Sequence, residues 1–119
     1  MEQSIYEEVC SALGVAKEDE SFQTTLMIYI SASVEALYQV GAIKTTTVDI
    51  STKLDNLVDE PKPDENKRAQ RLMLGYIFTS CRLLFDPPQP SAIAPLEKIK
   101  DEYLWRVTFI YDPSQEVLT

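Results

Sequence analysis

Carboxylates are the residues of this sequence that could carry acid–base chemistry, and several of them occur in groups. A carboxyl group that acts as a general acid needs apolar surroundings that raise its pKa. These groups lie instead at the ends of expected helices or in loops, so we interpret each of them as solvated surface. They are Glu7/Glu8, Glu18/Asp19/Glu20, Asp59/Glu60 and Asp101/Glu102.

Other residues that carry chemistry are scarce. The sequence contains no histidine, which is the commonest general base and metal ligand. Its cysteines, Cys10 and Cys81, lack the close spacing of a zinc site, and we interpret both as small buried residues in a reducing compartment. Its glycines, Gly14, Gly41 and Gly75, form neither a phosphate-binding loop nor a nucleophile elbow. We therefore predict no enzyme activity, no catalytic residue, no metal and no cofactor.

Length and charge narrow the class of protein further. The chain has 119 residues, which is typical of one domain, so we treat residues 1–119 as a single domain. Its net charge of −8 argues against ordinary nucleic-acid binding, because basic side chains supply most of that affinity. The acidic N-terminus is unlike a signal peptide, and polar residues between Ser21 and Ile43 argue against a membrane span. We expect a soluble, intracellular protein.

The distribution of apolar residues, glycines and prolines predicts an all-α fold, a small bundle of about four helices. A capping box formed by Ser4 and Glu7 opens the first helix, and Gly14 ends it. A long loop separates the second helix from the third. The expected helices are Ser4–Leu13, Asp19–Val40, Asp64–Phe85 with Asp64 as its N-cap, and Ser91 to about Tyr111.

Three segments leave alternatives open. The second helix is apolar nearly all round, so it is either central in the bundle or covered by other subunits. The loop 44–63 is either a mobile surface loop with a short helical turn or a segment ordered only against a partner. Residues 104–111 are rich in β-branched and aromatic side chains, which a strand would favour, but their apolar period favours a helix.

Arg82 is a first candidate for contact with another chain. It lies one turn from the end of an otherwise apolar helix. One interpretation is that Arg82 complements the negative end of this helix and pairs with Asp86, four residues on. The other is that Arg82 contacts a neighbouring subunit.

The terminal helix provides further candidates. At 100° per residue, Trp105 and Phe109 point away from Tyr103 and Val107. Trp and Tyr are favoured interface residues, so one of these faces is expected to meet another chain, unless the monomer buries both. The candidate interface residues are Arg82, Tyr103, Trp105, Phe109 and Tyr111.

Most of the chain follows the pattern of a known family. The stretches that carry the likeness are IYEEVCSALGVAKEDESFQTTLMIYISASVEAL, NKRAQRLMLGYIFTSCRLLFD and the tail from Pro87. In their order and character they resemble the small head–tail connector proteins of tailed bacteriophages, the adaptors that bind beneath the portal. The chain departs from the family in Arg82-Leu83-Leu84-Phe85, where a polar stretch is usual, and in its aromatic segment 104–111.

The resemblance implies a structural virion protein at the head–tail junction, assembled in the host cytoplasm. It implies a ring of about twelve copies that docks on the portal, extends the DNA channel and presents a surface to a stopper or tail-completion protein. Carboxylates along such a channel would repel phosphates and let DNA pass without sequence-specific binding. The candidate channel-lining acids are Glu18, Asp19, Glu20, Asp59 and Glu60. The loop 44–63 and the terminal segment are candidates for portal and neighbour contacts.

Other functions would require sequence features that this chain shows only weakly. An acidic interaction protein, such as an inhibitor or DNA mimic, needs carboxylates at phosphate-like spacing along one face, whereas these cluster at helix ends. A helical regulator or antitoxin needs a basic recognition helix, and only Lys67, Arg68 and Arg71 form a basic group at helical spacing. An enzyme comes last, because no nucleophile or base is evident.

Overall fold

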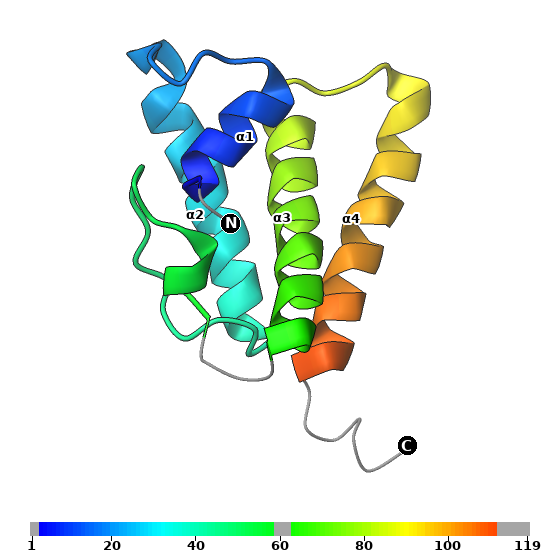
Figure 1. The fold of residues 1–119 in the computed structure, drawn as a ribbon. Helices are drawn as coiled ribbons and strands as arrows, with labels where there is room; N and C mark the ends of the chain where they lie inside the picture. Colours follow the sequence, from blue (N-terminus) through cyan, green and yellow to red (C-terminus); the bar gives the residue numbers. More distant parts are fainter. Residues whose placement is uncertain (1–2, 59–62, 112–119) are drawn as a thin grey trace.

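The computed structural model describes residues 3–58 and 63–111, and side chains within 3–58 and 67–110. The described part is helical and contains no strand, which confirms the all-α prediction. Two single-turn 3-10 helices, η1 and η2, accompany four α-helices (Figure 1). In chain order the elements are α1 (Ile5–Leu13), η1 (Glu20–Phe22), α2 (Gln23–Gln39), η2 (Leu54–Asn56), α3 (Pro63–Phe85) and α4 (Pro90–Tyr111).

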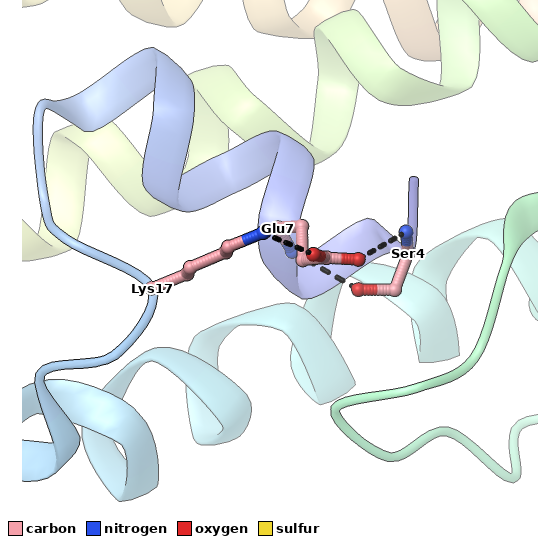
Figure 2. A network of polar contacts seen from close by, with 3 residues as sticks. All are labelled: Ser4, Glu7 and Lys17. Carbon is pink, nitrogen blue, oxygen red and sulfur yellow. Dashed lines mark hydrogen bonds and ion pairs between the residues drawn. The ribbon is translucent and has the colours of Figure 1, made fainter. Parts of the chain in front are cut away.

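The capping box predicted for the first helix is present (Figure 2). The Glu7 N–H donates to Ser4 Oγ, and the Ser4 N–H donates to Glu7 Oε1, both at 3.1 Å. The other Glu7 oxygen accepts a hydrogen bond from Lys17 Nζ at 3.2 Å, and these donors lower the pKa of Glu7. At the other end, Gly14 takes a left-handed conformation with φ 76° and closes α1.

The second helix is shorter than predicted. We expected it to begin at Asp19, but Asp19 instead caps η1, because its carboxylate accepts from the Ser21 N–H at 2.9 Å. The α-helical hydrogen bonds start only at Gln23. The third helix begins at Pro63, so Asp64 lies in its first turn and is not the N-cap. Proline suits the first helical position, since its missing N–H would have no partner there.

The central helix of the bundle is α3 rather than α2, which excludes the first of the two alternatives left open for the second helix. α3 packs against α1, α2 and α4, and it lies between α2 and α4 in Figure 1. The row Ala69, Met73, Ile77 and Cys81, at four-residue spacing on α3, is fully buried. α2 buries one face only, and its Ile28 is 61% exposed.

The loop after α2 packs on the bundle of its own chain. Leu54, Leu57 and Val58 are buried in the core. The Thr52 carbonyl accepts the N–H of Ile5 at 2.9 Å, which satisfies one of the free donors at the start of α1. The described part of the loop is therefore held by contacts with its own chain, and its last residues, 59–62, lie outside the description.

The last segment forms a helix through Tyr111, as the apolar period indicated. α4 approaches α3 closely where the Tyr103 ring lies over Gly75. A Cβ atom on Gly75 would come within 2.8–3.0 Å of three atoms of that ring. The absence of a side chain at Gly75 thus sets the spacing between α3 and α4. Val107 is the one fully buried residue among the described side chains of α4.

We predict that Gly75→Ala destabilises the protein although alanine favours helix over glycine by about 1 kcal/mol. The new methyl group would displace the Tyr103 ring, and such overpacking costs about 1–3 kcal/mol. In a Tyr103→Ala background, the same change should stabilise by about 1 kcal/mol. Chemical denaturation of all four variants measures the coupling, and additive effects would contradict the close approach.

Candidate assembly interface

The outer face of α4 carries an exposed aromatic pair. Trp105 is 64% exposed and Phe109 is 45% exposed, while Val107 faces α3 and is fully buried. The two rings lie 5.8 Å apart between centroids, so they form one apolar protrusion, called here the aromatic knob. The predicted opposition of the two faces is therefore confirmed, and the monomer does not bury both. Tyr103, grouped with the knob by sequence, is half-buried against α3.

A groove lies on the α2 side of the bundle. Its volume is about 600 Å³ and it opens to solvent. Helix α2 forms one wall and the loop at 48–50 forms the other, with Ile28 and Ile50 exposed at 61% and 44%. We call this site the α2 groove, and it is lined by Gln23, Thr24, Met27, Ile28, Ser31, Val48, Asp49 and Ile50.

Hydrogen bonds shape the loop wall of the α2 groove. Asp49 Oδ1 accepts from the N–H and hydroxyl of Ser51, at 2.8 and 2.7 Å, and from the hydroxyl of Thr52 at 3.1 Å. The Thr52 hydroxyl in turn accepts from the Asp49 N–H at 2.9 Å. These donors lower the pKa of Asp49, so the groove keeps a negative charge at neutral pH. The loop wall of the groove is thus a turn held by hydrogen bonds.

Charge is divided unequally between the two flanks of the bundle. The described residues 3–58, which include α1 and α2, contain eight acidic and three basic side chains. The described side chains of 67–110, from α3 and α4, contain four acidic and seven basic ones. Among the described side chains, residues 3–58 therefore have an excess of acid and residues 67–110 an excess of base, while most of the net charge of −8 comes from residues outside these two ranges.

Arg82 lies in the last turn of α3, where a cation complements the helix end. Within the described part of the chain it forms no ion pair with Asp86, whose backbone N–H bonds instead to the Arg82 carbonyl at 3.0 Å. The Nε atom of Arg82 is buried and has no hydrogen-bond partner there. Because this atom is enclosed by its own chain, a contact of Arg82 with another chain would have to use the terminal nitrogens of its half-buried guanidinium, which donate to carboxylates or carbonyls.

The remaining candidate residues have the following positions. Glu18, Asp19 and Glu20 are exposed in the turn between α1 and α2. Hydrogen bonds from Ser21 lower the pKa of Asp19, which stays ionised. The structure does not describe Asp59, Glu60 or the side chain of Tyr111.

The described residues offer little for catalysis. Both thiols are free and buried, as predicted, and burial raises the pKa of Cys10 and that of Cys81, the latter to about 12. Neither is therefore an activated nucleophile. No cluster of acidic or cysteine side chains that could hold a metal occurs within the described ranges. Among the described helices, none has the length and apolar character needed to cross a membrane.

The comparison with known families agrees with the resemblance seen in sequence. A family model described as phage connector protein matches residues 5–114. The chain belongs to this family. The connector therefore has a structural role in a bacteriophage, which points to the virion. No curated protein and no solved structure matches the chain.

The α2 groove was missed by sequence reasoning. Its only signal was the excess of apolar residues on α2, Met27 and Ile28 among them, beyond the stripe needed for one buried face. The other wall comes from residues 48–50, about twenty positions along the chain, and no local pattern links the two walls.

We predict that Trp105→Ala changes the free energy of unfolding of the monomer by less than about 1 kcal/mol, because Trp105 is mostly exposed. The matched change Val107→Ala on the same helix should cost about 2 kcal/mol, since it empties a fully buried position. Thermal and denaturant unfolding of dilute protein checks both values. A larger loss for Trp105→Ala would show that the knob belongs to the core of the monomer.

Proposed function

We propose that the connector forms a ring on the phage portal, extends the DNA channel and presents a docking surface to a stopper or tail-completion protein. The observation that carries the proposal is the match to the phage connector family across residues 5–114. Two features of the monomer support it. An exposed aromatic pair and an unfilled groove lie on the surface of a small domain, where large apolar patches generally mark interaction sites.

The acidic half of the connector suits a DNA channel. Under this proposal Glu18, Asp19 and Glu20 face the lumen, where ionised carboxylates repel phosphates and keep the duplex from adhering. Asp59 and Glu60 belong to the same proposal from their sequence alone. DNA would then pass without sequence-specific binding, because no base-reading contact is needed for transport.

Arg82 and the aromatic residues of α4 are the proposed contacts with other virion proteins. The terminal nitrogens of the half-buried Arg82 guanidinium would donate to an acceptor on the portal or on a neighbouring copy. Tyr111, at the end of α4, belongs to the same proposed surface. The connector would be made in the host cytoplasm and incorporated at the head–tail junction, with about twelve copies in a closed ring.

We predict that the purified connector binds isolated rings of its phage portal and adds a layer of density to them. Sedimentation measures the binding, and negative-stain microscopy shows the layer. Arg82→Glu should weaken binding while leaving the helical circular-dichroism signal intact, whereas Arg82→Lys, which keeps the charge, should bind better than Arg82→Glu. A folded wild-type connector that does not bind the portal would contradict the proposed function. Equal binding by Arg82→Glu would remove Arg82 from the interface.

We predict that the triple variant Glu18→Gln, Asp19→Asn, Glu20→Gln slows DNA ejection from assembled particles, most strongly at low ionic strength, where charge repulsion is least screened. Asn at position 19 retains an acceptor for the Ser21 N–H, so η1 should be preserved. The matched control is Glu97→Gln, Asp101→Asn on the exposed surface of α4. Ejection kinetics that do not change in the triple variant would exclude these residues from the channel lining.

A further inference from the structure

We infer that neighbouring connector subunits meet head to tail, with the aromatic knob of one copy seated in the α2 groove of the next. The inference rests on the proposed ring and identifies the two surfaces that would close it. A ring built by rotation needs two different, complementary patches on each subunit. A single self-complementary patch would give only a dimer.

The knob and the groove lie on opposite flanks of the bundle. α3 separates α2 from α4, and Figure 1 shows these helices on either side of it. Trp105 and Phe109 face away from α3, as their exposure and the burial of Val107 show. One subunit can therefore use both surfaces at once, which is the condition for a continuous series of copies.

The two surfaces are complementary in shape and polarity. The knob is a pair of packed rings that protrude from a helix. The groove is open to solvent, has a volume of about 600 Å³ and has Met27, Ile28 and Ile50 in its walls. Pockets of this size hold drug-sized groups. A buried tryptophan with a second aromatic residue is the kind of anchor that dominates interface energies.

The distribution of charge favours a second copy of the chain as the occupant of the α2 groove. Asp49 lies in the groove, and the exposed Glu35 shares a face of α2 with Ile28 and Ser31 at helical spacing. Beside the knob, the exposed Lys98 lies two helical turns before Trp105 and the exposed Asp101 lies one turn before it, so this face of α4 carries charges of both signs. The acidic side of the groove in one copy would thus face a surface of the next copy that has a lysine available for pairing. Pairing of two groove sides would instead bring like charges together.

The arrangement has a geometric consequence. The groove lies along the first half of α2, and the knob lies near the last turn of α4, so the two differ in height along the bundle (Figure 1). If the two surfaces meet at one level of a closed ring, the helices must be inclined to the ring axis. A ring with its helices parallel to that axis would not bring the knob and the groove together.

Complementation between two variants tests the inference. Trp105→Asp removes the knob and keeps the groove, while Ile28→Asp places a charge in the groove and keeps the knob. Each variant alone should associate about thirtyfold more weakly than wild type, or worse. An equimolar mixture should form heterodimers, because one intact interface remains, and should form nothing larger. Analytical ultracentrifugation distinguishes these species.

A matched control is available at an exposed apolar position outside both surfaces. Leu84→Asp on α3 changes a side chain that is 57% exposed, and it should leave association unchanged. Circular dichroism checks that every variant is folded. Association that survives in Trp105→Asp or Ile28→Asp, or a mixture without heterodimers, would overturn the inference.

If the wild-type protein associates too weakly to sediment as an oligomer, chemical cross-linking provides a second measurement. A zero-length carbodiimide joins lysines to carboxylates that are in contact, and mixed isotope labels distinguish links between chains. We expect interchain links from Lys98 to Glu35 or Asp49 at the highest soluble concentration, with fewer links as salt is raised. Absence of these links would also overturn the inference.

The experiments distinguish a failure of the proposed function from a failure of the proposed interface between copies. A connector that binds the portal but gives neither heterodimers nor the expected links keeps its proposed function and loses this interface. A connector that associates head to tail but does not bind the portal keeps the interface and loses the function. If Ile28→Asp weakens only portal binding, the groove belongs to the portal and the inference is wrong.

Discussion

The packing of α3 against three other helices is the constraint on which the rest of the bundle depends. Helix α3 has a fully buried row of side chains from Ala69 to Cys81, and both α1 and α2 pack against it. Toward α4, Gly75 provides the space that the Tyr103 ring occupies. Because α3 takes the central position, α2 and α4 each have one face that the described part of the chain leaves uncovered.

This arrangement explains why the connector exposes aromatic and aliphatic side chains despite a well-formed core. Scattered apolar residues are normal on protein surfaces, but Trp105 and Phe109 touch each other, and Ile28 and Ile50 line one groove. A thin bundle cannot cover both flanks with its own residues. The same helix packing that stabilises the monomer therefore leaves two apolar surfaces exposed.

Local signals predicted the ends of elements well where one residue type determines the geometry. The capping box at Ser4, the left-handed Gly14 and the apolar period of α4 all appear in the structure. The position of each helix in the bundle was predicted less well. α2 contains more apolar residues than its core face needs, and this excess suggested a central helix, whereas it belongs partly to the groove.

Features that arise from several segments could not be predicted from local patterns. The position of Asp49 at the groove depends on a turn closed by Ser51 and Thr52, and the groove itself needs a loop folded back beside α2. The state of Arg82 likewise depends on what surrounds the end of α3. Spacing along the chain suggested a bond to Asp86, but the folded chain does not form one within its described residues.

Under the proposed function, the distribution of charge would link these surfaces to the transport of DNA. The acidic side of the α2 groove would face Lys98 of the next copy, and the exposed acids around Glu18 would remain free to face a duplex. One arrangement of subunits would thus provide both cohesion of the ring and a repulsive channel. Neither property requires a cofactor or a catalytic group.

The most direct test is a three-dimensional reconstruction of the connector bound to its portal, at a resolution that traces helices. We predict a closed ring in which α4 of each subunit packs against α2 of the next, with the helices inclined to the ring axis and the turn around Glu18 toward the lumen. A ring in which the knob faces solvent and α2 contacts only its own chain would contradict the head-to-tail contact. A portal that carries no connector would contradict the connector function itself.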